Sequence, residues 1–319
     1  MRKTLLLLLS ASALGASAQS ESGLWLGADV SYDITRRLGA EFELGTRFED
    51  DFSRLTRYDA ALGIDYKLLP WLKLGAGYDF IRDYSPGEAP TIVYKKDANS
   101  PDGLRHDSDG NLVVNGYNAE ASYWRTKHRV YLDATGKWKA GRFSFSLRER
   151  YQFTSYAAVS DVELRYRDEL ESSNLASYSG PYAGPYVDSE GDSYWYGLTN
   201  TRSKDAKSKH YLRSRLAVDY NIRHCPLTPF ASYEIANDLG DAFSIVRHRA
   251  TIGFDWALTR NKQHTLSLAY AYQHGAHEEV GNSDLHIISL GYKLSLESPR
   301  AKAARKAQKK ARKAAAAAR

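Results

Sequence analysis

The chain has 319 residues and a single cysteine, Cys225, which excludes a secreted fold held together by disulfides. Its formal net charge is +6, but nine Lys and Arg residues lie from Arg300 onward and two more at the N-terminus, so the rest of the chain carries about −5. The basic character therefore belongs to the C-terminal tail, and the composition does not indicate a nucleic-acid-binding protein.

The first 18 residues are organised like a cleaved export signal. Arg2 and Lys3 precede an apolar run from Leu5 to Leu14, and the small-residue pattern Ala16-Ser17-Ala18 follows. The run has about ten residues, whereas a helix that crosses a bilayer needs roughly twenty. No cysteine follows at cleavage distance, so a lipid-anchored lipoprotein is not indicated. We expect a signal peptide over residues 1–18.

Strict alternation of apolar and polar residues is the main pattern in the rest of the chain. Side chains at i and i+2 share a face of a strand, so an alternating segment has one apolar and one polar face. Such segments occur at 24–33, 38–49, 57–68, 71–80, 127–138, 142–156, 209–222, 228–236, 244–258, 264–274 and 285–296. Most have about nine to fifteen residues, the length of a tilted membrane strand, whereas strands of a soluble β-sandwich average about five or six. The alternative of a soluble secreted sandwich is therefore disfavoured.

The connections between these segments fall into two classes. Two stretches of more than forty residues lie at 82–126 and 157–208, while short turns lie at 35–37, 69–70, 139–141, 223–227 and 260–262. Transmembrane barrels have short periplasmic turns and long extracellular loops. We count about eleven segments, but a bacterial single-chain barrel normally has an even number of strands. The prediction is an all-β, antiparallel transmembrane β-barrel of about twelve strands over residues 19–298, located in the outer membrane.

Aromatic residues gather at both ends of the alternating segments. Those near the short turns are Tyr66, Trp71, Trp138, Phe143, Tyr220, Phe230 and Trp256, and those near the long loops are Tyr84, Tyr123, Trp124, Tyr151, Phe153 and Tyr156. Tyr and Trp prefer the headgroup level of a bilayer. Two girdles at opposite ends indicate contact with outer-membrane lipid on the outer face.

A series of short motifs follows in order from Trp25 to Leu296. They include Trp25-Leu26, Gly63-Ile64-Asp65-Tyr66-Lys67, Leu72-Lys73-Leu74-Gly75-Ala76-Gly77-Tyr78, Leu147-Arg148-Glu149-Arg150-Tyr151-Gln152, Arg247-His248-Arg249 and His286-Ile287-Ile288-Ser289-Leu290-Gly291-Tyr292. In this order they resemble the uncharacterised outer-membrane barrel family called domain of unknown function 2490. The resemblance implies the barrel architecture and implies no activity.

The final strand also resembles the signal that the barrel-assembly machinery recognises in its clients. It has a polar residue, a glycine two positions later and then spaced apolar residues, namely Ser289, Gly291, Leu294 and Leu296. Such strands usually end the protein, whereas here a tail follows. We expect the barrel-assembly machinery to be a partner.

The inward face of the predicted barrel is strongly charged with nearly balanced signs. Its candidate lumen residues are Arg47, Arg57, Arg129, Arg148, Arg150, Arg213, Arg215, Arg247, Arg249, Glu41, Glu43, Asp59, Asp65, Asp79, Asp133, Asp219, Glu234 and Asp255. In a narrow barrel such side chains can pair and fill the lumen as a polar core. The alternative is a small pore whose opposed charges orient a solute.

The sequence gives no indication of an enzyme, a cofactor or a metal site. Barrel lipases and deacylases carry a lipid-facing His two residues from a Ser, and no His-x-Ser occurs here. His248 lies on an apolar face, where an interface or subunit contact explains it. The acidic segment 107–111 partly resembles a calcium loop, but its Gly comes too early and no closing Glu follows, which favours an ordinary turn.

Three further features leave alternatives open. The Tyr-rich segment Tyr178–Tyr196 could contact a partner or a sugar, which would suit an adhesion or binding barrel acting through its loops. Glu149 interrupts an apolar face and indicates a bulge, a subunit contact or a position near the rim.

The tail over 299–319 is rich in Ala, Lys and Arg without an apolar stripe, so we expect it to be solvated and helical only when neutralised. It is either a disordered extension or an anchor to an anionic cell-wall or membrane surface from the periplasmic side.

Overall fold

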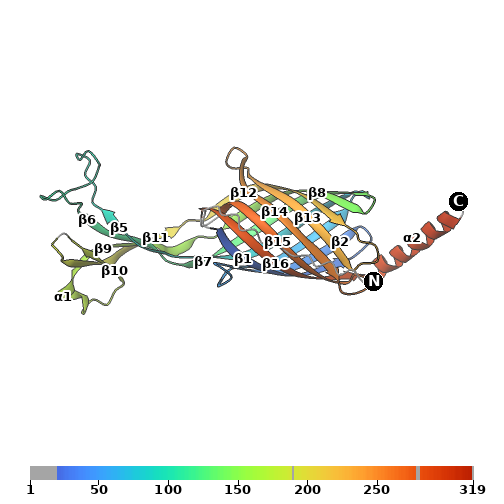
Figure 1. Ribbon diagram of the computed structural model, residues 1–319, viewed down its shortest axis with the longest axis horizontal. Coiled ribbons are helices and arrows are strands. Elements are labelled where there is room, and N and C mark those ends of the chain that lie inside the picture. Colours follow the sequence, from blue (N-terminus) through green and yellow to red (C-terminus); the bar gives the residue numbers. More distant parts are fainter. Residues whose placement is uncertain (1–19, 189, 278–280, 318–319) are drawn as a thin grey trace, which may run out of the picture.

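The computed structural model describes residues 20–188, 190–277 and 281–317, so the predicted signal peptide over 1–18 lies outside the described residues. Within them, eleven strands close into a barrel and five form a second sheet. Figure 1 shows the barrel and, beyond one of its ends, the second sheet. The predicted all-β barrel is confirmed. In the same part of the chain no helix is long and apolar enough to cross a bilayer.

The barrel strands follow the alternating segments of the sequence. They are β1 (Ser20–Asp33), β2 (Leu38–Glu49), β3 (Arg54–Lys67), β4 (Leu72–Ser85), β7 (Tyr123–Ala140), β8 (Phe143–Tyr156), β12 (Lys207–Tyr220), β13 (Leu227–Asp238), β14 (Ser244–Ala257), β15 (His264–His277) and β16 (Gly281–Glu297). Short turns join β1 to β2, β3 to β4, β7 to β8, β12 to β13 and β14 to β15 at one end of the barrel, the short-turn end. The opposite end is called the loop end below.

The barrel closes through a parallel pair. β1 pairs with β16 in parallel, from Ser20 opposite Asp284 to Asp33 opposite Glu297, and every other neighbouring pair of described barrel strands is antiparallel. The expected count of about twelve is therefore corrected to eleven among the described residues. An odd number of strands that alternate in direction must close with one parallel pair, and this seam replaces the additional strand that an even count would require.

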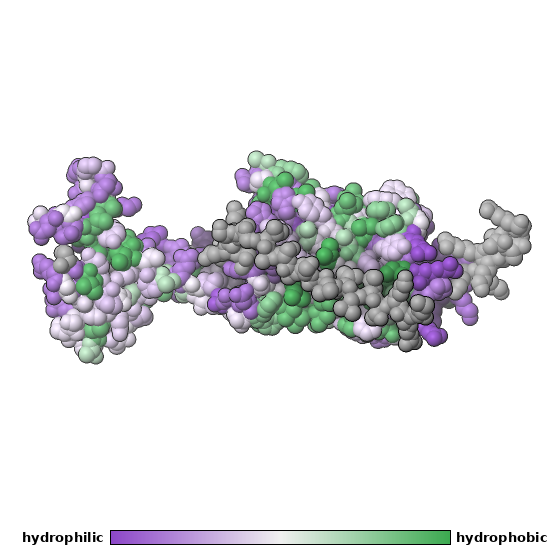
Figure 2. Space-filling model, viewed as in Figure 1, coloured by the Kyte–Doolittle hydropathy of each residue, from purple (hydrophilic) through white to green (hydrophobic). Residues whose placement is uncertain are grey.

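Apolar side chains cover the outside of the barrel. Leu62, Ile64, Leu132 and Ile252 are each about 60% exposed, the reverse of their usual placement in a soluble protein. In Figure 2 hydrophobic residues gather over the barrel, while hydrophilic residues gather at its two ends and on the second sheet. The outward face is thus the apolar belt that the alternation predicts.

The two stretches expected to be long loops fold into a second sheet, the outer sheet, beyond the loop end (Figure 1). Its order is β10-β11-β9-β6-β5, with β5 (Glu88–Tyr94), β6 (Val114–Glu120), β9 (Val159–Glu171), β10 (Tyr182–Val187) and β11 (Ser193–Lys204). The four-residue helix α1 (Ser172–Leu175) follows β9. The loops can meet because they leave the barrel from β4, β7, β8 and β12, which are neighbours in the barrel.

The outer sheet has a core of its own. Val114, Tyr117, Tyr166, Ala183 and Tyr196 are all buried together. At its base the Arg125 guanidinium, 2% exposed, donates to the carbonyls of Ala157 at 2.9 Å and Asp205 at 2.6 Å. Lys204 and Glu120, from different loops, form an ion pair at 2.9 Å. These contacts make the two loops one folded unit.

The C-terminal tail forms helix α2 (Pro299–Ala317), which leaves the barrel at the short-turn end, opposite the outer sheet (Figure 1). Its Ala, Lys and Arg residues have high helix propensity, which explains a helix without an apolar stripe.

Candidate functional site

All eighteen charged residues proposed for the lumen lie at inward positions of barrel strands. The structure arranges them in two walls of opposite character and a packed layer near the loop end. The arginine wall is formed by β7, β8, β12, β13 and β14, and the acidic wall by β1, β2 and β3. This separation depends on which strands are neighbours, so the alternation alone did not predict it.

Glu234 on β13 is the centre of the arginine wall. Its side chain is 5% exposed and accepts hydrogen bonds from Arg213 and, at 3.3 Å, from Arg148. Arg247 and Arg249 each lie 4.0 Å from the same carboxylate. One carboxylate therefore faces four guanidinium groups. Two of these groups also donate to neutral side chains: Gln152 accepts from Arg213 at 3.1 Å and Gln273 accepts from Arg249 at 3.0 Å.

The arginine wall continues through β7 and β8. Arg150 donates to Asp133 at 2.7 Å, and its guanidinium lies 3.8 Å from the ring centre of Tyr131. The Tyr131 ring itself packs over Gly77, where an added Cβ would lie 2.3 Å from ring atoms. Arg129 pairs with Asp79 at 3.4 Å. Across the wall, Arg residues outnumber the carboxylates that they contact.

The acidic wall faces these arginines from the other side of the lumen. Glu41 accepts from Lys293 on β16 at 2.8 Å, and Asp65 lies 3.6 Å from Lys73. Among the described residues, Asp29 and Glu43 on the same wall have no cation within 4.0 Å. Asp29, Lys73, Lys137, Lys293 and Tyr131 were not among the predicted site residues, although their inward parity in the sequence would have identified them.

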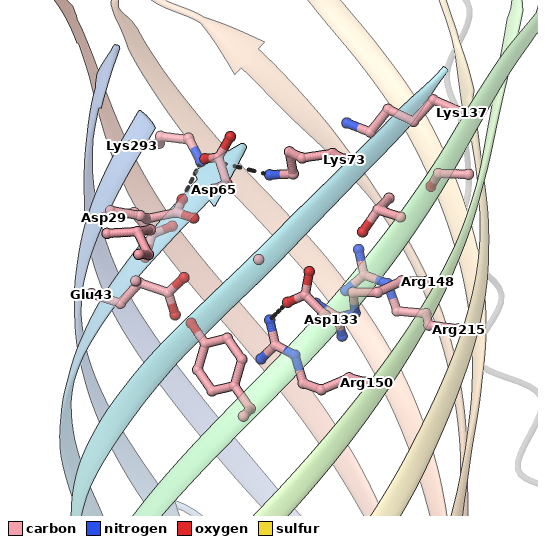
Figure 3. A pocket seen from close by; sticks show the side chains of 17 residues that line it. Asp29, Glu43, Asp65, Lys73, Asp133, Lys137, Arg148, Arg150, Arg215 and Lys293 are labelled. Carbon is pink, nitrogen blue, oxygen red and sulfur yellow. Dashed lines mark hydrogen bonds and ion pairs between the residues drawn. The ribbon is translucent and has the colours of Figure 1, made fainter. Parts of the chain in front are cut away.

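A cavity of about 280 Å³ separates the two walls. Figure 3 shows Asp29, Glu43 and Lys293 on one side and Asp133, Arg148, Arg150 and Arg215 on the other. Lys73 and Lys137 line the cavity toward the short-turn end. The remaining space is large enough for a few water molecules or a small solute. Asp219 and Asp255 lie apart from this cavity, and Asp255 accepts a hydrogen bond from Ser267.

Toward the loop end the lumen is filled by a packed layer. Asp83 accepts from Arg57 at 2.5 Å and from Lys127 at 2.6 Å, and both Lys127 and Tyr156 have no exposed surface. The Lys127 ammonium lies 4.6 Å from the ring centre of Tyr156. Deeper in the barrel, Trp25 lies between Arg47 and Arg249, whose guanidinium carbons are 4.0 and 4.7 Å from its ring centre. This structure is therefore constricted between the loop end and the cavity.

In the described part of the chain, no group of three or more His, Cys, Asp or Glu residues could hold a metal ion. In the segment 107–111, the Asp107 carboxylate accepts from the backbone N–H groups of Asp109 at 2.9 Å and Asn111 at 2.8 Å. These backbone hydrogen bonds lower the pKa of Asp107 and form an ordinary Asx turn.

The sequence model of the family described as "Protein of unknown function (DUF2490)" matches residues 22–283. No curated protein matches the chain. Among solved structures, the chain is similar to the beta domain of the Bordetella autotransporter BrkA, at 12% identity over 77% of this chain and 78% of that chain, with a TM-score of 0.38. It is also similar to the NanC porin, at 12% identity, 83% and 92% coverage and a TM-score of 0.37. A third is the outer-membrane protease OmpT from Escherichia coli, at 11% identity, 74% and 73% coverage and a TM-score of 0.31.

Proposed function

Because the chain belongs to the DUF2490 family, whose function is open, and because two oppositely charged walls face its lumen, we propose that it is a narrow outer-membrane channel for small charged solutes. The observation that carries this proposal is the cavity of about 280 Å³ between the arginine wall and the acidic wall. A lumen that served only as a polar core would pair its charges locally and leave no such space.

The two walls would act on a solute through their transverse field. A carboxylate moves along the guanidinium groups of Arg148, Arg150 and Arg215, while an ammonium group turns toward Asp29 and Glu43. Charges in a narrow, low-dielectric lumen interact more strongly than in water and attract ions of the opposite sign. We therefore expect small carboxylates and zwitterions to pass in preference to neutral solutes of equal size.

The packed layer at the loop end makes the described state a closed one. Barrels of about eight strands are filled by side chains, whereas those of sixteen or more leave an aqueous channel. An eleven-stranded barrel lies between these limits. Movement of the side chains around Tyr156 would connect the cavity to the loop end, so we expect small and intermittent currents.

Recording from single proteins in a planar bilayer tests this function. The wild type should show reproducible unitary currents, and Arg148→Gln with Arg150→Gln should change their size. Arg202→Gln on β11, which removes one positive charge from an exposed position in the outer sheet, is the control and should leave the currents unchanged. Electrical silence of correctly folded wild type, with silence also after Tyr156→Ala, would contradict the channel.

The location that we propose is the outer membrane, with the short-turn end toward the periplasm. The apolar belt, the predicted export signal and the two classes of connection support this orientation. Ser289, Gly291, Leu294 and Leu296, which resemble the assembly signal, all lie on β16 at the parallel seam. We propose the barrel-assembly machinery as the partner that inserts this strand.

A second function, binding at the cell surface, is supported by the outer sheet. It has a hydrophobic core and a groove of about 450 Å³ that Lys95, Asn111, Glu169, Tyr186 and Tyr194 help to line. Aromatic faces beside amide and carboxylate groups suit a polar organic ligand such as a sugar. Deletion of residues 88–120 and 159–204 separates the two functions, because a channel would keep conducting while a surface-binding barrel would lose its ligand.

A further inference from the structure

A basic groove lies at the short-turn end of the barrel, away from the lumen. It has a volume of about 670 Å³ and is formed by the turn after β1, the end of β3 with the turn after it, and the first residues of α2. Its lining residues are Thr35, Arg36, Arg37, Tyr66, Lys67, Leu68, Leu69, Pro70, Arg300 and Ala304. Neither the channel nor the outer sheet uses this groove.

The start of α2 is fixed on the barrel, so Arg300 has a defined position over the groove. The Ser298 hydroxyl donates to the carbonyl of Ile34 at 2.6 Å and accepts from the N–H of Ala301 at 3.0 Å. The Ser298 N–H donates to the carbonyl of Asp33 at 3.0 Å. Ala301 is only 6% exposed. Ser298 therefore caps the helix and ties its first turn to the turn after β1.

The groove carries positive charge without a compensating carboxylate in its lining. Its cations are Arg36, Arg37, Lys67 and Arg300, and none of its ten lining residues is acidic. Lys67 has Asp33 at 3.9 Å, whereas Arg36, Arg37 and Arg300 have no carboxylate within 4.0 Å among the described residues. The lining thus carries three arginines that no carboxylate neutralises, and guanidinium groups bind phosphate through paired hydrogen bonds.

One wall of the groove is apolar and continuous with the belt. Tyr66, Leu68 and Leu69 are each at least 40% exposed and extend the outward face of β3. Nearby Trp71 is 57% exposed, as expected of an aromatic residue at the headgroup level. Figure 2 shows hydrophilic residues gathered at this end of the barrel, directly beyond the hydrophobic surface. The groove therefore lies at the boundary between hydrocarbon and headgroups.

We propose that this groove binds an anionic phospholipid of the periplasmic leaflet. The headgroup phosphate lies among Arg36, Arg37 and Arg300, and an acyl chain lies along Tyr66 and Leu68. The apolar wall favours a lipid over a free phosphate ion, because a free ion would leave that wall without a partner. Binding would hold α2 against the membrane surface, so the tail acts as part of a defined lipid site and does not anchor through its charge alone.

The test is a calorimetric titration of the folded full chain in neutral detergent. The titrants are dioctanoyl phosphatidylglycerol, dioctanoyl phosphatidylcholine and inorganic phosphate. We expect saturable binding of phosphatidylglycerol that is at least tenfold tighter than binding of either other titrant. Equal affinity for inorganic phosphate would overturn the lipid assignment, and equal affinity for phosphatidylcholine would overturn the role of the groove's charge.

Two triple variants separate the groove from the rest of the tail. Arg36→Gln, Arg37→Gln and Arg300→Gln should weaken phosphatidylglycerol binding about tenfold or more, since each cation near a membrane surface contributes several-fold. Lys302→Gln, Arg305→Gln and Lys306→Gln remove the same charge from exposed positions of α2 outside the lining of the groove and should have a small effect. Equal losses in both triples would show general attraction to the tail and overturn the site. Heat-modifiable mobility in gels verifies that each variant is folded.

Discussion

The hydroxyl oxygen of Tyr233 on β13 lies 2.8 Å from Nδ1 of His248 on β14. Both side chains lie on the outward face, at positions two residues apart in the strand register. The same diagonal contact recurs at 2.6–2.7 Å between Tyr78 and His128, Tyr151 and His210, Tyr292 and His264, and Tyr270 and His286. Each pair satisfies a phenol and an imidazole where water is scarce. His248 therefore has a structural role on the outer face, and it lies outside the lumen.

Breaking this pair should weaken the barrel. Tyr233→Phe leaves Nδ1 of His248 without its partner and should lower the free energy of unfolding in micelles by about 1 kcal/mol. Tyr182→Phe in the outer sheet is the control and should change it less. Urea unfolding of Tyr233→Phe, His248→Leu and the double variant gives the coupling energy, and a coupling of zero would show that the contact contributes nothing.

Glu149 is acceptable on the apolar face because Ser214 lies directly opposite it on β12. The Ser214 hydroxyl donates to its carboxylate at 2.6 Å, and the two residues are partners in the β8–β12 register. Ser214→Ala removes the donor and should lower the free energy of unfolding by about 1–2 kcal/mol. Glu149→Gln keeps an acceptor without the charge and should be neutral or stabilising. Greater damage from Glu149→Gln than from Ser214→Ala would contradict this account.

Opening the packed layer should increase conductance. Tyr156 has no exposed surface and its ring is contacted by Lys127 and, at 5.1 Å, by Lys207. Tyr156→Ala removes the ring that fills the lumen, and unitary conductance should rise severalfold. Tyr156→Phe retains the ring and should conduct like wild type. If Tyr156→Ala does not change the current, the constriction lies elsewhere.

The outer sheet should respond to high pH through Tyr196. Burial, together with nearby Glu169, raises the pKa of Tyr196 from its ordinary value near 10 to about 12. Because the unfolded state ionises first, the stabilisation is full below about pH 10 and is lost as the pH rises toward 12. The difference in tyrosinate absorbance between wild type and Tyr196→Phe should titrate near pH 12. A difference that titrates near pH 10 would contradict a buried Tyr196.

Alternation along the chain was sufficient to predict the barrel strands and the inward position of every predicted lumen residue. Each such inference needs only the two-residue period of a strand, as between Arg148 and Arg150 on β8. Alternation did not predict the strand count. The rule that bacterial single-chain barrels have an even number of strands does not allow for the parallel pairing of β1 with β16. Nothing local in either segment encodes the direction of its partner.

Local sequence patterns also did not predict the outer sheet or the separation of opposite charges in the lumen. Segment 161–168 alternates and lies in β9, but its partners β6 and β11 belong to distant parts of the chain. Glu234 gathers four arginines only because β8, β12 and β14 lie close to β13 in the barrel. Both features depend on which strands pair with one another, and the pattern of a single sequence does not show these pairings.

The reversal potential of single channels in a salt gradient tests the opposed walls most directly. Arg148→Gln with Arg150→Gln removes positive charge and should move selectivity toward cations, while Glu41→Gln with Glu43→Gln removes negative charge and should move it toward anions. Arg202→Gln should leave the reversal potential at its wild-type value. We expect shifts of opposite sign for the two double variants. Shifts of the same sign, or no shift in either, would contradict a charge-separated lumen that ions traverse.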